Sequence, residues 1–477
     1  MLFSTTNIQP SYESEIQKSI LENSRSNEKY NKPKELAINS SRRLSRLKLI
    51  FIAIDGMGDL PIKSLGNKTP LEAAETPNMD NLARNGETGL MYSVKKGVAP
   101  ESDAAVISLL GYDPFKYSTG RGVIEAIGAG LKMKDGDLAL RCNFATLGQG
   151  KNIIDRRVAR SLTTEEAIAL SHAANTQVKL ESYPATFEFR NTLGHRAVLL
   201  IKSRRKPLSS NITNSDPAYT IVNGIGVAKA KVDMVLKTCE PTDNTEEAKN
   251  SAALVNEFIN KTYELWDNHP INIKRVAEGL LKANVILTRD AGHLLPKFFN
   301  IDKKYHVDFA CLADMHAERG IAQLAGMNSK LLPPPSGNLA KDCEVRVKAL
   351  IEALPKHDCF YIHLKGPDEP GHDGNCTMKT QIISAIDKYF FGPLLKQISL
   401  KDNLICITTD HATPCSLKVH TDTPVPVLIS GGSVNSRNNR RMVKFSEKDC
   451  AKGNLGLIER GCELMPRLMN LLKQKSP

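Results

Sequence analysis

Residues 47–59 read LKLIFIAIDGMGD, a stretch in which six consecutive apolar residues stop at Asp55 and a turn containing two glycines. A short β-branched apolar run closed by turn residues is typical of a strand buried on both faces, as in a parallel sheet. Asp55 would then lie at the carboxyl end of the strand, where open α/β sheets bind their ligands. The stretch therefore predicts an α/β fold and a first candidate site residue.

Apolar segments of the same kind return in the last part of the chain. They are NVILT at 284–288, HVDFACLADM at 306–315, CFYIHLKGPDE at 359–369 and NLICITTDH at 403–411. Helical patterns lie between several of them, and alternating strands and helices predict a parallel sheet with helices on both faces. End signals mark two earlier helices, one starting after Thr76 with Pro77 at its first position, the other spanning residues 102–110. Ser102 and Asp103 can cap the second helix.

The middle of the chain has a different pattern. LALRCNFAT at 138–146, ATFEFRNT at 185–192 and HRAVLLIKS at 195–203 resemble antiparallel strands, and a helical stretch follows at 245–265. We therefore predict a smaller α+β domain over residues 135–300. It is inserted into a core formed by residues 49–134 and 301–477.

Composition excludes some functions. The chain has 477 residues, and no apolar run approaches the roughly 20 residues that a membrane-spanning helix needs. Residues 1–48 are rich in Ser, Asn, Lys and Glu, lack the apolar region of a secretory signal, and are predicted to form a flexible leader. Ten scattered cysteines without a C-x-x-C pair indicate reduced thiols and a cytoplasmic protein.

The net charge of +12 favours anionic partners. Basic clusters at 204–206 and 437–441 are either solvated surface or attract phosphorylated molecules or nucleic acid. Aromatic residues make up only 5% and form no stripe with basic residues, so we expect no nucleic-acid partner. Oligomeric state cannot be read from these features.

Metal-ligating residue types follow three of the predicted strands. They are Asp55 after the first, Asp368, Glu369, His372 and Asp373 after YIHLKG, and Asp410, His411 and His420 after the run that ends at 409. Mixed carboxylate and imidazole donors suit Zn²⁺ or Mn²⁺, whereas carboxylates alone would suit Mg²⁺ or Ca²⁺. Each motif alone is common by chance, but their coincidence at predicted strand ends favours a metal centre, and the number of donors favours two ions.

These motifs resemble a known family. The evidence is Asp55-Gly56, the TPNMDNLA helix, LALRCNFAT with IIDRRVAR, HRAVLLI with NSDPAY, GIAQLAGM, HLKGPDEPGHDG, and TTDHATP with KVHTDTPVPVLISGG. Together they resemble the archaeal-type, cofactor-independent phosphoglycerate mutases of the alkaline phosphatase superfamily. The resemblance covers roughly residues 49–469.

The resemblance implies an alkaline-phosphatase-like parallel-sheet core with an inserted smaller domain. It also implies a reaction that interconverts 3-phosphoglycerate and 2-phosphoglycerate through a phosphoserine. The resemblance implies two divalent ions. We expect Mn²⁺ or Mg²⁺ in preference to Zn²⁺ or Co²⁺. The ligands carried over are Asp55, Ser102, Asp410 and His411 for one ion, and Asp368, His372 and His420 for the other.

Ser102 in PESDAA matches the family's nucleophile. A serine hydroxyl is a poor nucleophile at neutral pH, and a nearby metal ion and a helix N-terminus would both help it accept a phosphoryl group. From the residues alone, a plain capping serine would be the simpler interpretation. Glu369 and Asp373 are expected to orient the metal ligands.

Substrate residues are predicted in the inserted domain. Arg156 and Arg157 of IIDRRVAR match phosphate and carboxylate groups in bidentate geometry, and Asp155 could move the proton between the two hydroxyls. The same residues, with Arg160, could equally form a surface ion-pair run. Further candidates are His195, Arg196 and Asp216. Asp290 departs from the family, which tends to carry glycine there.

Two other functions remain open at this point. A metal-dependent phosphomonoesterase, or another phosphomutase of the same superfamily, would share the core and differ in the inserted domain. A catalytically silent binding protein would keep the fold, but all of the expected ligand positions are filled. We expect a small phosphorylated carboxylate as the substrate.

Overall fold

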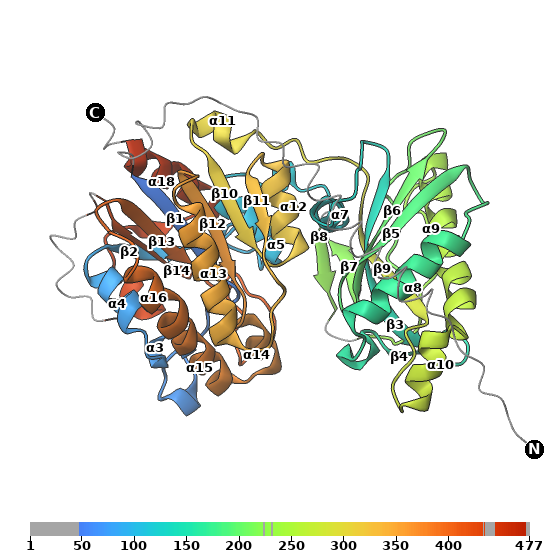
Figure 1. Ribbon diagram of the computed structural model, residues 1–477, viewed down its shortest axis with the longest axis horizontal. Helices are drawn as coiled ribbons and strands as arrows, with labels where there is room; N and C mark the ends of the chain where they lie inside the picture. Colours follow the sequence, from blue (N-terminus) through green and yellow to red (C-terminus); the bar gives the residue numbers. More distant parts are fainter. Residues whose placement is uncertain (1–46, 223–224, 230–231, 433, 435–443, 474–477) are drawn as a thin grey trace, which may run out of the picture. The chain divides into compact units, whose positions relative to one another are not determined.

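The computed structural model describes residues 47–222, 225–229, 232–432, 434 and 444–473 (Figure 1). The predicted leader at 1–48 lies outside them except for its last two residues, and the basic cluster at 437–441 lies outside as well. All described residues belong to one compact unit that spans Ser45–Pro477.

The larger sheet has eight strands in the order β11-β10-β12-β1-β13-β14-β2-β15. Their bounds are β1 Lys48–Ile54, β2 Glu87–Met91, β10 Phe309–Ala313, β11 Asn328–Leu331, β12 Cys359–Leu364, β13 Asn403–Thr408, β14 Val425–Gly431 and β15 Gly456–Ile458. The strands from β11 to β13 are parallel, whereas β14 is antiparallel to both neighbours. The predicted α/β class with a largely parallel sheet is confirmed, and the reversed β14 is a difference.

Alternation along β1 explains why helices cover both faces of this sheet. Leu49, Phe51 and Ala53 enter one core cluster, and the intervening isoleucines enter another. The first cluster includes residues of α5 Ser102–Leu109, α12 His316–Leu324 and α18 Leu464–Lys473. The second includes residues of α4 Pro77–Arg84, α13 Leu339–Ala353 and α15 Cys376–Ile386. Figure 1 shows α4, α13 and α15 together over one face.

Shorter elements complete this part of the chain. They are η1 Lys63–Leu65, α3 Pro70–Ala73, α6 Pro114–Tyr117, α11 Ile301–Tyr305, α14 Asp368–Asp373, η3 Asp387–Phe391, α16 Gly392–Leu395, α17 Glu447–Cys450 and η4 Gly461–Glu463. The predicted helix after Thr76 is α4, which starts at Pro77. Thr76 occupies its N-cap position, but the Thr76 hydroxyl donates to Asp80 Oδ1 at 3.1 Å instead of accepting from the helix.

The second sheet is antiparallel and has five strands in the order β4-β3-β6-β5, with β9 also paired to β3. Their bounds are β3 Leu138–Leu147, β4 Ile153–Asp155, β5 Ala185–Leu193, β6 Arg196–Ser203 and β9 Val285–Gly292. Associated elements are α7 Arg121–Gly128, η2 Val158–Arg160, α8 Thr164–Gln177, β7 Tyr219–Val222, β8 Ile225–Ala228, α9 Glu246–Asp267 and α10 Pro270–Ala277. Trp266 of α9 is buried against Phe144 and Phe189. Residues 285–288 of the apolar run at 284–288 lie in β9, so this run belongs to the antiparallel sheet, and the prediction that it joins the parallel sheet was wrong.

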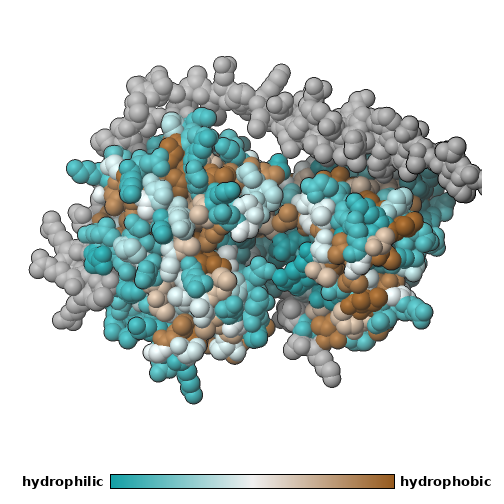
Figure 2. Space-filling model, turned by 60° about the horizontal axis from the view of Figure 1, so that its bottom comes forward, coloured by the Kyte–Doolittle hydropathy of each residue, from teal (hydrophilic) through white to brown (hydrophobic). Residues whose placement is uncertain are grey.

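Hydrophilic and hydrophobic residues are interspersed over the face shown in Figure 2. The ten cysteines, all among the described residues, form no disulfide with one another, and eight of them are buried. Among the described residues, the structure has no helix with the length and apolar character needed to cross a membrane.

Candidate active site

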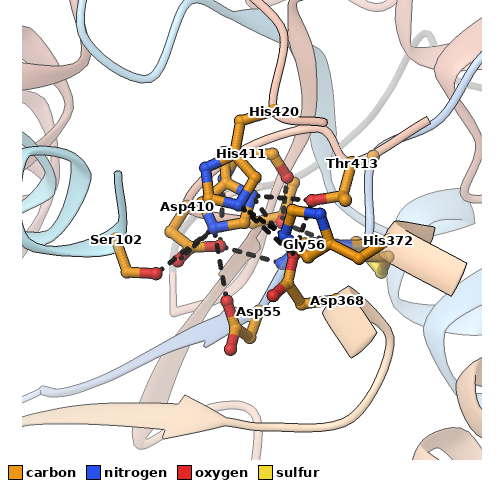
Figure 3. A network of polar contacts seen from close by, with 12 residues as sticks. Asp55, Gly56, Ser102, Asp368, His372, Asp410, His411, Thr413 and His420 are labelled. Carbon is orange, nitrogen blue, oxygen red and sulfur yellow. Dashed lines mark hydrogen bonds and ion pairs between the residues drawn. The ribbon is translucent and has the colours of Figure 1, made fainter. Parts of the chain in front are cut away.

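Three adjacent parallel strands deliver the predicted metal ligands. β1 lies between β12 and β13. Asp55 directly follows β1, Asp368 begins the short helix α14 after β12, and Asp410 follows β13. Because parallel strands end at one edge of a sheet, these residues meet there. Figure 3 shows that their side chains converge with those of Ser102, His372, His411 and His420.

Glycines let the segments after these strands approach each other closely. Gly56 has a φ of +61°, and a Cβ built there would lie 2.7 Å from Asp368. A Cβ at Gly58 would lie 2.9 Å from the Ala412 side chain. The Thr413 N–H donates to the Gly58 carbonyl at 3.0 Å. The glycines of the turn after β1 are therefore required by close packing.

Asp55, Asp410 and His411 form the first metal-capable group, and all three are buried. One possible ligand atom from each lies within 4.8 Å of the others. His411 Nε2 is 3.4 Å from Asp55 Oδ1 and 3.3 Å from Asp410 Oδ2. Neither carboxylate oxygen has a hydrogen-bond partner among the described residues. Because an unsatisfied buried oxygen is costly, the group fits a divalent cation that would be bound by both oxygens.

Hydrogen bonds hold this group in a fixed orientation. Asp410 Oδ1 accepts from the Gly56 N–H at 3.0 Å and from the His411 N–H at 2.9 Å, which leaves Oδ2 facing His411 Nε2. His411 Nδ1 lies 3.0 Å from Thr413 Oγ1, and the Thr413 hydroxyl donates to Asp368 Oδ1 at 2.7 Å. Thr413 therefore connects the first group to the second.

Asp368, His372 and His420 form the second metal-capable group. Both histidine Nε2 atoms are 3.5 Å from Asp368 Oδ1 and 3.1 Å from each other. Their Nδ1 atoms face backbone carbonyls, of Lys418 at 3.0 Å and Pro100 at 2.9 Å, so each Nδ1 carries the proton and donates. Both Nε2 atoms and a carboxylate oxygen then face one point, which fits a cation there, either a proton on one Nε2 or a metal ion.

Charge around the second group is strongly biased toward acids. Burial lowers the pKa of His420, but the hydrogen bond to Asp368 and the charge of Glu101 outweigh burial and raise that pKa to about 9. Burial raises the pKa of Asp368, as does the charge of Asp55, yet the neighbouring histidines hold it below its usual range. The groups therefore favour a positive charge at this point.

Ser102 is the first residue of α5. Its Oγ lies 3.3 Å from His411 Nε2, so the hydroxyl faces the first metal-capable group. The prediction that Ser102 or Asp103 caps the helix is not what the structure shows, because Glu101 occupies the N-cap position and makes no side-chain capping bond. The Ser102 side chain is directed to the site instead.

Three charged residues of the site were not found by sequence reasoning. Lys365 Nζ is 3.0 Å from Asp55 Oδ2 and donates to Glu318 Oε1 at 2.7 Å. His363 Nε2 is 3.4 Å from Asp410 Oδ2. Burial lowers the pKa of His363 and so does Lys365, but Asp410 and Glu318 outweigh them and raise it to about 10. The available signal was a histidine inside the apolar run of β12, His363, and a lysine directly after it, Lys365; no sequence signal marked Glu318 on α12.

A second cluster of charge lies on the antiparallel sheet. We define the arginine cluster as Arg141, Arg156, Arg157, Arg196 and Arg289. Arg156 makes a bidentate pair with Asp216, with both N–O distances 2.8 Å, and Arg289 Nη1 donates to Asp216 Oδ2 at 3.0 Å. Burial and the nearby Arg121 lower the pKa of Arg141 to about 10. The five guanidinium groups outnumber the three acids that contact them among the described residues, Glu125, Asp216 and Asp290, as expected of an anion site.

His195 lies within the charge of this cluster. Burial lowers its pKa, and Arg196, Arg157 and Arg289 lower it further, to about 3. The imidazole is therefore neutral at physiological pH and can still donate or accept a hydrogen bond.

A left-handed turn follows Asp155. Val158, Ala159 and Arg160 have φ values of 54°, 50° and 56°, which non-glycine residues rarely adopt. Asp155 Oδ1 accepts from the N–H of Arg157 at 2.6 Å and of Ala159 at 2.8 Å and so holds the turn. One oxygen of Asp155 thus has a structural task that its sequence context did not reveal.

Glu369 and Asp373 were expected to orient the metal ligands. In the described structure, neither makes a hydrogen bond or an ion pair with a proposed ligand. Glu369 Oε1 accepts from Arg160 Nη1 at 2.6 Å. Asp373 is exposed at the end of α14. Their orienting role stays a prediction.

Known proteins resemble this chain in sequence. A family model described as 2,3-bisphosphoglycerate-independent phosphoglycerate mutase matches residues 83–272. The chain is 42% identical over 430 residues to the mutase of that description from Aeropyrum pernix, covering 89% of this chain and 100% of that one. It is 37% identical to the protein of the same description from Methanopyrus kandleri, covering 89% of this chain and 96% of that one.

Two solved structures resemble the fold. A protein structure from Pyrococcus horikoshii gives a TM-score of 0.71 at 30% identity, covering 91% of this chain and 99% of the other. A cofactor-independent phosphoglycerate mutase from Thermoplasma acidophilum gives 0.57 at 28% identity, covering 89% and 100%.

Fold and site first define a class, the α/β proteins that gather metal-capable carboxylates and imidazoles at the carboxyl ends of parallel strands. Within that class, the chain belongs to the family of 2,3-bisphosphoglycerate-independent phosphoglycerate mutases. The resemblance read from the sequence motifs is confirmed.

Proposed function

We propose that the chain interconverts 3-phosphoglycerate and 2-phosphoglycerate through a phosphoserine formed on Ser102. The activity named for its relatives supports this reaction. One observation carries the nucleophile: Ser102 Oγ lies 3.3 Å from His411 Nε2, which in turn contacts the unsatisfied oxygens of Asp55 and Asp410.

Two divalent cations would be held at this site. Mn²⁺ or Mg²⁺ is favoured over Zn²⁺ or Co²⁺. The proposed ligands are Asp55, Ser102, Asp410 and His411 for one ion, and Asp368, His372 and His420 for the other. When bound, the ions would lower the pKa of the serine hydroxyl and neutralise charge on the transferring phosphoryl group. The grouping into two sets of three carboxylate and imidazole donors supports this assignment.

The chain's own residues then have distinct tasks. The N–H groups at the start of α5 face the phosphoryl oxygens. Arg156, Arg157, His195 and Arg196 bind the carboxylate and phosphate of a small phosphorylated substrate, and Asp155 transfers a proton between its hydroxyls. We assign these tasks to an inserted substrate-binding domain, residues 135–300. Residues 49–134 and 301–477 form the metal-binding core.

Retention of glycerate distinguishes a mutase from a phosphatase. After the serine has taken the phosphoryl group, the glycerate must remain bound and reorient, so that the other hydroxyl receives the phosphoryl group. An arginine cluster short of acids supports such retention, because the glycerate carboxylate still carries a charge. The reduced, mostly buried thiols of the described cysteines support a cytoplasmic location.

The test supplies 3-phosphoglycerate and Mn²⁺ to the purified chain and detects 2-phosphoglycerate with enolase. Free phosphate without 2-phosphoglycerate would favour the phosphomonoesterase, and Mn²⁺ binding without turnover would favour the silent binding protein. Ser102→Ala should lower turnover about 1000-fold or more while Mn²⁺ binding by the second group persists. Ser108→Ala, in the same helix and buried, is the matched control and should keep turnover.

A further inference from the structure

Lys379 is a lysine with no exposed surface and three oxygen partners. It lies on α15, and its Nζ donates to the carbonyls of Gly58 at 3.0 Å and Thr413 at 2.8 Å and to Asp59 Oδ2 at 2.8 Å. An ammonium group has three N–H donors, so all of them are used. Gly58 and Asp59 follow β1, whereas Thr413 follows β13, so the partners come from two segments of the metal centre.

We define the first ligand loop as residues 55–59 and the second ligand loop as residues 410–415. Asp59 lies in the first, is buried, and accepts from the Cys415 N–H of the second at 3.3 and 3.2 Å. Lys379 and Asp59 therefore each contact both loops.

Thr413 carries this connection to the ligands. Its carbonyl accepts from Lys379, and its N–H donates to Gly58 O at 3.0 Å. Its hydroxyl contacts His411 Nδ1 and donates to Asp368 Oδ1. A displacement of Thr413 would therefore move a ligand of each metal-capable group.

We propose that Lys379 and Asp59 are positioning residues that hold the two ligand loops together, and that tight divalent-ion binding depends on their ion pair. The proposal rests on the proposed metal centre. A buried ion pair is often replaceable by apolar residues without loss of stability, so stability alone does not explain a lysine here. Its partners, two loop carbonyls and a loop carboxylate, explain it.

The test measures Mn²⁺ binding to the full, metal-free chain by titration, together with the melting temperature. Residues that orient metal ligands typically change affinity 10- to 100-fold, so Lys379→Met should weaken Mn²⁺ binding by roughly that factor. The Lys379→Met/Asp59→Asn double variant removes both charges. It should regain melting temperature relative to Lys379→Met yet still bind Mn²⁺ at least about 10-fold more weakly than the wild type.

Arg346→Met provides the matched control. Arg346 is buried, is ion-paired to the buried Asp314, and contacts neither ligand loop in the described structure. It should lower the melting temperature and leave Mn²⁺ affinity within about twofold, because no ligand loop moves. A loss of affinity in this variant equal to that of Lys379→Met would show a general effect of instability and overturn the proposal.

The outcomes separate the two levels of inference. A wild-type chain that binds no divalent ion would overturn the metal centre and this proposal with it. Mn²⁺ binding that is normal in the wild type and unchanged in Lys379→Met would overturn only the positioning role. Should Lys379→Met fail to fold, Asp59→Asn alone decides, with a roughly fivefold or greater loss of affinity expected and no change contradicting the proposal.

Discussion

The metal-capable groups and the arginine cluster both gather buried charge, but the chain assembles them differently. The first come from segments more than 300 residues apart, Asp55 and Asp410 among them, and meet because β1, β12 and β13 are parallel neighbours. The second lies on β3, β6 and the segments beside them, in an antiparallel sheet. In a parallel sheet, functional residues lie where the strands end, whereas in an antiparallel sheet they lie side by side on one face. Only the first arrangement is visible in the sequence, as a polar residue directly after an apolar run.

The two regions also differ in what balances their charge. In the metal-capable groups, carboxylate oxygens remain without hydrogen-bond partners among the described residues. In the arginine cluster, Asp216 already binds two guanidinium groups, and Arg141 is still crowded by Arg121. The metal-capable groups therefore need additional positive charge, and the arginine cluster needs additional negative charge. We infer that metal binding and substrate binding can be separated by mutation, which the following variants test.

Asp410→Asn should have the largest effect. It removes a negative charge from the first group, and turnover should fall about 1000-fold or more because the serine loses its activation. Mn²⁺ titration should show the loss of one ion. Asp387→Asn is a suitable control, since Asp387 is also fully buried but binds the start of α4; it should keep both ions. An equal loss of Mn²⁺ in Asp410→Asn and Asp387→Asn would contradict the assignment of Asp410 as a metal ligand.

Asp216→Asn should affect the other region. Removing one member of a buried ion pair costs about 3–5 kcal/mol, and Arg156 and Arg289 would lose their orientation. KM for 3-phosphoglycerate should rise roughly 10- to 100-fold while Mn²⁺ affinity stays the same. Glu246→Gln, which breaks an exposed pair with Lys249, should change neither. A shared loss of Mn²⁺ binding would mean that the regions are coupled.

Glu447 gives the metal-binding region a pH dependence. Burial raises its pKa from 4.5 to about 7, and it accepts from the Asp59 N–H and from Thr69. Between pH 4.5 and 7 the folded chain holds a proton that the unfolded chain releases, so the free energy of unfolding falls as pH rises. The fall should be at most about 3 kcal/mol and absent in Glu447→Gln, as measured by urea unfolding of the metal-free chain. A wild-type curve as flat as the variant's would contradict this.

Asp290→Gly should have the smallest effect. Asp290 has a φ of +55°, which glycine adopts at lower cost, and its carboxylate is 3.8 Å from Arg141 and 3.6 Å from Arg289. Relief of strain should raise stability by about 1 kcal/mol, and loss of the charge should lower KM two- to fivefold. Asp290→Asn isolates the charge and should show the change in KM alone. A rise in KM would mean that Asp290 holds the arginines in place.

The comparison explains what the sequence could and could not predict. Asp55, Asp368 and Asp410 were found because an apolar run that ends in an acid marks a strand end. His363 was missed because it lies inside an apolar strand, where side chains are expected to pack, and Lys365 was missed because a single lysine directly after a strand is usually solvated. The antiparallel direction of β14 depends on its pairing with β13 and β2, which an apolar run does not specify.

The arginine cluster was found only in part, for the same reason. IIDRRVAR revealed Arg156 and Arg157 through their density, but Arg141 and Arg289 stand singly within strands β3 and β9. Their proximity follows from the register that pairs Arg141 with Arg289 across the two strands. The register depends on pairing across the whole sheet, so a local sequence pattern does not predict it.

The turn at Val158–Arg160 has a consequence for engineering. Each left-handed L-residue costs roughly 1–2 kcal/mol. Three in succession therefore store backbone strain, which the contacts of the folded chain must offset. Buried Arg275 contributes to this by donating to Ser161, the residue directly after the turn. A designer seeking a heat-resistant form would therefore begin at Ala159, where glycine removes a cost without removing a functional group.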